Sequence, residues 1–186
     1  MTADNTNIVD TLSGQLRPLR RAALGLGSNV GDRLEMLQNA VTTLLATPMV
    51  APVAVSPVYE TEPVGGPDDQ DSYLNAVLVV ETIALARLLL ERALSTEAAY
   101  GRIREERWAP RSLDIDLLAY GSRVYDDPEC TVPHPRAHER AFVLAPWADI
   151  DPDFTVPGHG AVRDLLAKTD TSGVRRRNDL HLVLPL

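Results

Sequence analysis

The order in which two hydrophobic periodicities follow each other constrains the fold of this chain more than any other feature of its sequence. Short apolar or alternating runs predict β-strands, and stretches in which leucine and valine recur every three or four residues predict amphipathic helices. The predicted strands are residues 22–27, 50–59, 73–81 and 113–120, and the predicted helices are residues 30–47 and 85–100. Strand–helix–strand–strand–helix–strand is the order of a split βαβ unit. We therefore predict an α+β fold with a ferredoxin-like βαββαβ core, in which helices pack on one face of an antiparallel sheet and C-terminal additions follow.

Local signals set the boundaries of the first elements. Gly25 and Gly27 predict that the first strand ends in a turn, and Ser28 with Asn29 offers an N-cap for the helix that follows. Two shorter helices are predicted after the core, at 137–147 and 161–168.

A length of 186 residues favours a single domain. Residues 1–20 are polar and aperiodic, which predicts a disordered extension, and the folded domain is expected over residues 21–168. In the remaining tail, residues 169–186, the apolar run Leu180–Leu186 is the candidate for an added edge strand. The arginines of the segment 174–177 are interpreted as part of a solvated turn.

Charge and cysteine content narrow the class of protein. The formal net charge is −8, so binding to nucleic acid through broad phosphate neutralisation is not expected. The single cysteine, Cys130, cannot form an intrachain disulfide, which favours a cytoplasmic protein. No run of about 18 apolar residues occurs, so no membrane span is expected.

Two aspartates on the last predicted strand are candidate metal ligands. Asp114 and Asp116 are two residues apart, so both carboxylates leave the same face of the strand. Leu113, Ile115 and Leu117 leave the other face and enter the core. Paired carboxylates on a rigid strand suit a hard cation such as Mg²⁺, which shares its coordination with phosphate oxygens. The alternative is a half-buried strand that shows two polar residues to water.

The segment before this strand concentrates positive charge on an acidic chain. Its arginines are Arg102, Arg104, Arg107 and Arg111. Guanidinium groups bind phosphate oxygens in bidentate fashion, and phosphoryl transfer asks a protein mainly for positioning and charge neutralisation. A solvated loop paired to Glu105 and Glu106 is the alternative, although Trp108 and Pro110 weigh against a purely solvent-exposed segment. The combination predicts a site for a magnesium–polyphosphate.

Five sequence blocks occur in one order along the chain. They are GLGSNVGDR (25–33), YETEPVGGP (59–67), YLNAV (73–77), GRIREERWAPRSLDIDLL (101–118) and VPHPRAHERAFVLAPW (132–147). Together they resemble the 6-hydroxymethyl-7,8-dihydropterin pyrophosphokinase family of folate biosynthesis, over roughly residues 22–150. The resemblance implies a ferredoxin-like enzyme that transfers the pyrophosphate of ATP to the hydroxymethyl group of the pterin and releases AMP.

The resemblance also assigns the catalytic half of a site. The residues that match catalytic positions are Arg102, Arg104, Arg111, Asp114 and Asp116. Two Mg²⁺ ions are implied between the two aspartates and the ATP phosphates, with Arg102 and Arg111 in contact with the phosphates. Arg104 and Trp108 belong to a loop that closes when both substrates are bound.

Two further sets of residues are implied for the substrates. Nucleotide-binding positions are matched by Glu97, Arg102, Trp108, Arg111, Leu117, Thr131, His134 and Arg140. Pterin-binding positions are matched by Thr61, Glu62, Val64, Tyr73, Asn75, Trp108 and Phe142. Tyr73 and Phe142 match the pair that stacks on the pterin ring, although both residues are equally compatible with a core. Asn75 in an apolar strand is more telling, because a buried amide without partners is costly.

The histidines leave alternatives open. His134 is compatible with a metal ligand, a general base or a structural residue, and the resemblance implies a hydrogen bond to phosphate, which we adopt. His138, His159 and His181 show no spacing typical of a metal site and are interpreted as surface residues. Pro135 stands where some family members carry tyrosine.

The expected partners are small molecules, ATP and hydroxymethyldihydropterin, with Mg²⁺ as cofactor and no nucleic acid or membrane. A monomer is expected. The alternative function is a non-catalytic ferredoxin-like module that binds nucleotide or RNA. The negative charge and the lack of an aromatic-rich sheet motif weigh against RNA.

Overall fold

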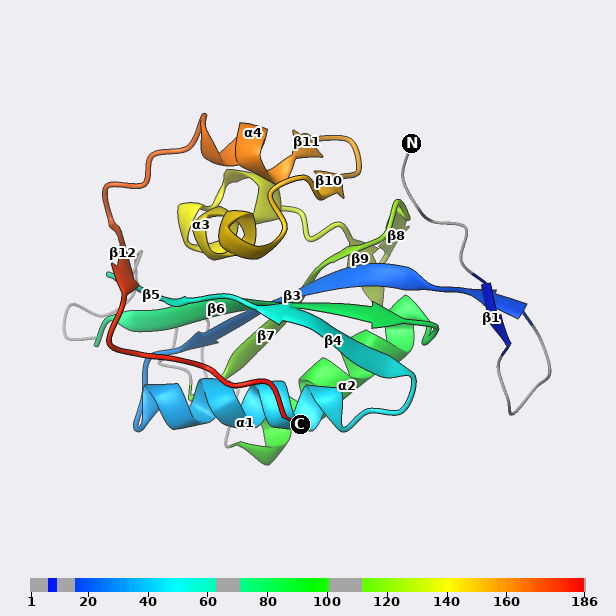
Figure 1. The fold of residues 1–186 in the computed structure, drawn as a ribbon, viewed down its shortest axis with the longest axis horizontal. Helices are drawn as coiled ribbons and strands as arrows, with labels where there is room; N and C mark the ends of the chain where they lie inside the picture. The colour runs from blue at the N-terminus through cyan, green and yellow to red at the C-terminus, as the bar shows by residue number, and fades with distance from the viewer. Residues whose placement is uncertain (1–6, 10–15, 63–70, 101–111, 186) are drawn as a thin grey trace.

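The chain folds into three layers around a central antiparallel sheet. A computed structural model describes residues 7–9, 16–62, 71–100 and 112–185. The strands of the central sheet are β3 (Arg20–Ser28), β4 (Val50–Val55), β5 (Val58–Thr61), β6 (Tyr73–Thr82), β7 (Asp114–Tyr120) and β12 (Val174–Arg177). The helices are α1 (Arg33–Leu45), α2 (Ala86–Ala99), α3 (Ala141–Ile150) and α4 (Val162–Leu166), with a 3₁₀ turn, η1 (Ala137–Glu139). Helices α1 and α2 cover one face of the sheet, and α3 and α4 cover the other (Figure 1).

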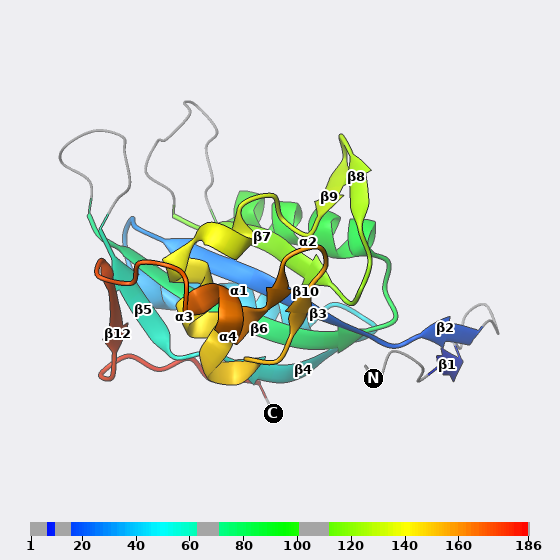
Figure 2. The same cartoon turned by 90° about the horizontal axis from the view of Figure 1, so that it is seen from above.

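Short antiparallel pairs lie outside the central sheet. They are β1 (Asn7–Val9) with β2 (Leu16–Pro18), β8 (Tyr125–Asp127) with β9 (Cys130–Val132), and β10 (Thr155–Val156) with β11 (Gly160–Ala161). The pair β1–β2 extends from one end of the sheet (Figure 2). Residues 1–20, predicted to be a disordered extension, therefore contain two short paired strands.

The strand order confirms the predicted ferredoxin-like core. The sheet runs β12–β5–β6–β3–β7, with β4 also paired to β6, and every pairing is antiparallel. Within it, β3, α1, β4–β5, β6, α2 and β7 form the βαββαβ unit, whose helices lie on one face as predicted. The C-terminal additions α3 and α4 cover the opposite face, and β12 extends the edge beside β5.

Alternation along the central strands produces two hydrophobic cores. In β3, Leu24 and Leu26 point to α1 and α2, whereas Ala23 points to the face covered by α3. On the α3 side the largest buried side chain is Trp147, which packs against Phe154 with ring centroids 5.0 Å apart. On the same face of the sheet, Asn75, Asp114 and Asp116 form a separate polar region.

Two local predictions at the start of α1 were wrong. Strand β3 continues through both glycines to Ser28, because β6 pairs with it as far as Ser28 and β7 as far as Gly27. The N-cap of α1 is Asp32, whose side chain accepts a hydrogen bond from the Glu35 backbone amide at 3.0 Å. Ser28 and Asn29 instead bond to other loops, through the carbonyl groups of Ser112 and Asp71.

The added edge strand comes from a different part of the tail than predicted. Val174–Arg177 pairs with β5, so the arginine-rich segment is a strand and not a solvated turn. Residues 180–184 run along α1 without forming a strand, and Gln38 exchanges hydrogen bonds with the Val183 backbone at 2.9 Å. Among the described residues, no helix is long and apolar enough to cross a membrane.

Candidate active site

A row of polar side chains crosses the sheet on the α3 face. Asn75 of β6 and Asp114 of β7 are both register partners of Gly27, which lies between them on β3. Two residues further along, Asp116 lies opposite Gly25. The register thus places three side chains on one surface. They are the Asn75 amide, which the resemblance assigns to the pterin, and the two carboxylates that are predicted to bind magnesium.

The glycines of β3 form the floor between these groups. A Cβ atom built on Gly27 would lie 3.3 Å from Asn75 Oδ1 and 3.9 Å from Asp114 Cβ, so a side chain there would press on the amide. At Gly25 a Cβ atom would meet Leu118 at 3.2 Å. Sequence reasoning assigned both glycines to a turn and missed this role. The available signal was their spacing of two, which places them on one face of a strand.

Asp114 and Asp116 are partly exposed on this surface. Their position fits the predicted metal site, because two carboxylates on one face of a central strand present oxygen ligands to a hard cation. Within the described ranges, no group of three or more His, Cys, Asp or Glu residues is arranged to hold a metal ion.

His134 and Arg140 face the carboxylates from the loop that leads into α3. The imidazole Nε2 of His134 lies 3.9 Å from Asp116 Oδ2, and its Nδ1 accepts a hydrogen bond from the Arg136 backbone amide at 3.1 Å. Burial lowers the pKa of His134, outweighing the opposite effect of Asp116. A neutral ring that accepts at Nδ1 carries its proton at Nε2, on the side that faces the carboxylates.

Arg140 is half-buried at the start of α3. Burial lowers the pKa of its guanidinium, with Asp116 and Asp114 acting in the opposite direction, and the group stays charged at neutral pH. The guanidinium also lies over the Phe142 ring, 5.6 Å from its centroid. The start of α3 thus carries a phosphate-binding candidate and a stacking candidate two residues apart.

The predicted pterin residues lie at the ends of β5 and β6. The Asn75 side chain is 6% exposed, and its Nδ2 donates to Thr61 Oγ1 at 2.9 Å. Thr61 is in turn the register partner of Tyr73. Phe142 is partly buried on α3, which packs on β6. Glu62 follows β5 and is exposed, and Val64 lies outside the described residues.

The arginine-rich segment 101–111 lies outside the described residues, and with it the predictions for Arg102, Arg104, Trp108 and Arg111. The residues on either side of it are bonded to each other. Ser112 Oγ donates to the Tyr100 carbonyl at 2.9 Å, and the buried Ser28 donates to the Ser112 carbonyl at 2.6 Å. Tyr100 and Ser112 therefore lie next to each other, and Ser112 is two residues before Asp114.

Three predicted nucleotide residues lie away from this surface. Glu97 is 1% exposed on α2, beneath the sheet, where its Oε1 accepts the backbone N–H of Ile115 at 2.8 Å. Leu117 belongs to the core on the same side. Thr131 is exposed on β9 and donates its hydroxyl hydrogen to the Asp127 carbonyl. Their predicted contacts with nucleotide stay predictions.

Of the remaining histidines, which were interpreted as surface residues, His159 and His181 are exposed and His138 is partly buried. His138 of η1 stacks on His159, with ring centroids 3.7 Å apart and an angle of 14° between the planes. His138 is only partly exposed, because the turn between β10 and β11 covers it.

Both the sequence and the fold of this chain are similar to those of known proteins. The model of a family described as 7,8-dihydro-6-hydroxymethylpterin-pyrophosphokinase (HPPK) matches residues 23–152. The 2-amino-4-hydroxy-6-hydroxymethyldihydropteridine pyrophosphokinase of Methylorubrum extorquens is 49% identical over 158 residues, which cover 85% of this chain and 99% of that protein. The Pseudomonas aeruginosa protein of the same name is 37% identical over 158 residues, covering 85% of this chain and 97% of that protein.

Solved structures show the same fold. Plasmodium falciparum HPPK-DHPS wild type with STZ-DHP superposes with a TM-score of 0.60 at 15% identity, covering 82% of this chain. The wild-type protein with pteroate gives a TM-score of 0.59. This chain spans 43% of the length of each of those chains.

Proposed function

The chain belongs to the 7,8-dihydro-6-hydroxymethylpterin-pyrophosphokinase family, and on this premise we propose how its residues perform the reaction. The enzyme transfers the pyrophosphate of ATP to the hydroxymethyl oxygen of 6-hydroxymethyl-7,8-dihydropterin, an activity of folate biosynthesis, and AMP leaves. The observation that carries the assignment of residues is the register of Asn75, Gly27 and Asp114 across three adjacent strands.

On the phosphate side, we propose that Asp114 and Asp116 hold two Mg²⁺ ions. Mg²⁺ bound there would supply positive charge to neutralise the phosphates. The chain's own residues supply hydrogen-bond donors around the same oxygens: the Nε2–H of His134 and the guanidinium of Arg140. We further propose, from the resemblance alone, that Arg102 and Arg111 of segment 101–111 also bind the phosphates.

On the acceptor side, Asn75 reads the edge of the pterin ring, and Tyr73 and Phe142 stack on its faces. The hydrogen bond from Asn75 Nδ2 to Thr61 fixes the plane of the amide. Its Oδ1 then lies beside Gly27, over which we propose that the flat ring lies. The hydroxymethyl group is thereby directed along the row toward the carboxylates.

Catalysis in this arrangement rests on positioning. The acceptor oxygen attacks the β-phosphorus, and the bond from that phosphorus to the oxygen of AMP breaks. Holding both substrates over one rigid sheet converts an encounter of two molecules into a local reaction. His134 and Arg140 stabilise negative charge on the oxygens around the transferred group.

The requirement for the acceptor tests this proposal. With Mg²⁺ and ATP, we expect AMP to form at a steady rate only when 6-hydroxymethyl-7,8-dihydropterin is added. The matched control is 6-methyl-7,8-dihydropterin, which has the same ring but no hydroxyl to accept the pyrophosphate. Equal consumption of ATP with the two pterins, or none with either, would refute the proposal.

The alternative of an RNA-binding module is not favoured, because the family and its named relatives are pyrophosphokinases. We further propose that the enzyme acts as a monomer in the cytosol.

A further inference from the structure

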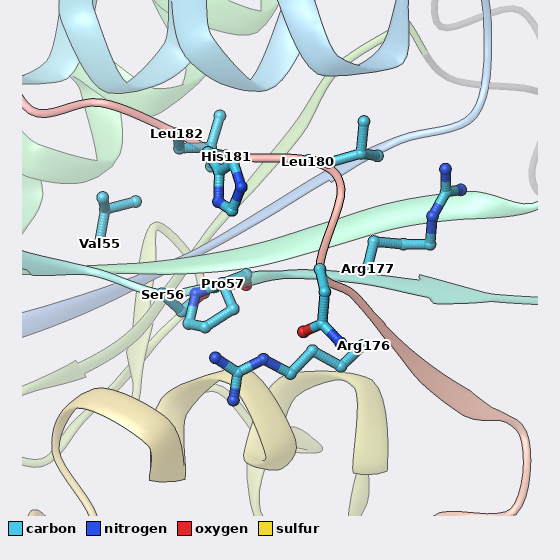
Figure 3. Close-up of a pocket in the computed structure, with 9 residues that line it drawn as sticks. Val55, Ser56, Pro57, Arg176, Arg177, Leu180, His181 and Leu182 are labelled. Carbon is cyan, nitrogen blue, oxygen red and sulfur yellow. Dashed lines mark hydrogen bonds between the residues drawn. The ribbon is translucent and has the colours of Figure 1, made fainter.

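Three consecutive arginines of β12 meet acidic residues on both faces of the sheet. Arg175 and Arg177 bond to Glu60 of β5, and Arg176 bonds to Asp149 of α3. In Figure 3, Arg176 extends along α3, whereas Arg177 leaves the opposite side of the strand. This alternation is what a strand imposes on neighbouring residues, and none of these five residues belongs to the substrate site described above.

Glu60 is the centre of the first group. Its side chain is 11% exposed and accepts from Ser72 Oγ at 2.8 Å and from Arg177 Nη1 at 3.0 Å, besides its bond to Arg175. Arg33, the first residue of α1, lies 3.4 Å from Oε1, the same carboxylate oxygen that accepts from Ser72. A carboxylate this far removed from water is stabilised by donors on several sides.

The donors join segments that are far apart in the sequence. Arg33 also donates to the carbonyl and to the hydroxyl of Ser72, the hydroxyl at 2.9 Å. Ser72 immediately precedes Tyr73, and Glu60 immediately precedes Thr61, the acceptor for Asn75. The position of the Glu60 carboxylate therefore fixes the ends of both strands that carry the pterin-binding candidates.

The second group ties α3 to the same strands. Arg176 Nη1 lies 3.3 Å from Asp149 Oδ2, and the Tyr59 hydroxyl donates to the same oxygen at 2.8 Å. Tyr59 is the register partner of Asn75, and α3 carries Phe142 at its other end. One strand of the tail thus fastens both elements that bear the proposed stacking residues.

We infer that Glu60 and the β12 arginines are positioning residues for the pterin half of the site, and that the tail strand sets acceptor affinity without touching the acceptor. The inference rests on the proposed function for the identity of the ligand. It predicts that losing these contacts weakens pterin binding but not nucleotide binding. The contacts of Glu60 lead to Tyr73 and Asn75, whereas the carboxylates proposed to hold Mg²⁺ lie on β7, at the opposite edge of the sheet.

A cavity of about 230 Å³ lies beside β12, between residues 55–57 and the tail 176–182 (Figure 3). Three of its polar lining residues are bonded within the chain: Ser56 accepts from the Val77 amide, and Arg176 and Arg177 pair with carboxylates. We therefore assign the arginines to the positioning of neighbouring strands and not to a ligand of this cavity.

The test is a comparison of two dissociation constants in the full-length chain. Glu60→Gln keeps the shape of the side chain and removes its charge, and Arg177→Met removes a donor. The probes are 6-hydroxymethylpterin, titrated with Mg²⁺ and α,β-methylene-ATP present, and α,β-methylene-ATP alone with Mg²⁺. We expect roughly tenfold weaker pterin binding in each variant, the scale of one lost charged hydrogen bond, and nucleotide binding within about twofold of the parent chain.

Arg87→Met is the matched control, since it breaks an exposed ion pair of 2.7 Å with Glu129 away from the site. It should change neither constant. Arg177→Lys should restore part of the pterin affinity, which a role in bulk stability alone does not predict. Unchanged pterin affinity in both Glu60→Gln and Arg177→Met, or equal losses for the two probes, would overturn the inference. Failure of the proposed function shows separately, as absence of acceptor-dependent AMP from the parent chain.

Discussion

Asp114 and Asp116 lie beside two basic side chains of the α3 face. Both leave the α3 face of β7, where His134 and Arg140 approach them. The structure leaves these carboxylates partly exposed, so neutralising one should spare the fold.

We predict that Asp116→Asn lowers the rate of AMP formation by at least about a hundredfold, since removing one group that stabilises the transferred charge commonly has this effect. The melting temperature should stay within a few degrees of the parent value. Asp164→Asn, on the exposed face of α4, is the matched control and should keep full activity. A near-parental rate for Asp116→Asn would show that the metal assignment is wrong.

Gly27 is the residue on which the two halves of the site meet. An alanine there places its Cβ 3.3 Å from Asn75 Oδ1, so the Asn75 amide must move by a few tenths of an ångström to accommodate it. We predict that Gly27→Ala weakens pterin binding by about tenfold, measured by fluorescence titration. Gly173→Ala is the control, because a Cβ at Gly173 meets no atom within 4 Å. Equal pterin affinity in the two variants would show that Gly27 does not contribute to the pterin site.

At the scale of elements, α3 is held over the sheet by a core contact and a polar one. Trp147 fills the core beneath it, and Asp149 joins it to Tyr59 and Arg176. Burial, together with the bond to Asp149, raises the pKa of Tyr59 to about 12, so its hydroxyl stays a donor throughout the neutral range.

Tyr59→Phe should therefore lower the free energy of unfolding by about 1 kcal/mol, the usual value of one hydrogen bond. The measurement is urea denaturation at neutral pH. Tyr125→Phe serves as the control, since the Tyr125 hydroxyl makes no hydrogen bond among the residues that the structure describes. If both substitutions have the same effect, the bond to Asp149 does not stabilise α3.

The sequence predicted the elements with strong periodicity and misplaced those whose positions depend on distant partners. The order of the core strands and helices followed from local patterns, and the D-x-D spacing placed both carboxylates on one face. The length of β3 depended on pairing with β6 and β7, which no local signal shows. Likewise Arg175–Arg177 form a strand because β5 offers a free edge and Glu60 an acceptor, contacts more than 110 residues away in the chain.

Dependence on distant partners also explains why the surroundings of Gly25, Gly27 and Glu97 could not be predicted from the sequence. Gly25 and Gly27 carry no side chain, so only the register with the neighbouring strands reveals what lies on either side of them. Glu97 matched a nucleotide-binding position by resemblance, but its carboxylate caps a backbone amide under β7. The row from Asn75 to Asp114 was visible only once the strand order was known.

For the whole molecule, the Glu60 group predicts how stability depends on pH. Burial alone would raise the pKa of Glu60, but hydrogen bonds from Ser72, Arg175 and Arg177 outweigh it and hold the pKa below its ordinary value of 4.5. A bond from Arg177 likewise holds the pKa of Asp179 at about 2. The unfolded chain binds these protons at higher pH than the folded chain does. The contribution of Glu60 and Asp179 to the free energy of unfolding is therefore fully present above about pH 4.5 and is lost as the pH falls below it.

Thermal unfolding measured between pH 7 and pH 3 should show this loss in the parent chain. In Glu60→Gln one titrating group is absent, so the fall in stability below pH 4.5 should be shallower. Parallel pH profiles for the two proteins would mean that the Glu60 ion pairs contribute nothing to stability.

The nucleotide product tests the central claim most directly. A pyrophosphokinase breaks the bond at the β-phosphorus, so separation of the nucleotides after reaction with ATP, Mg²⁺ and 6-hydroxymethyl-7,8-dihydropterin should show AMP. One diphosphorylated pterin should accompany each AMP. ADP with a monophosphorylated pterin, or inorganic phosphate with no phosphorylated pterin, would contradict the account.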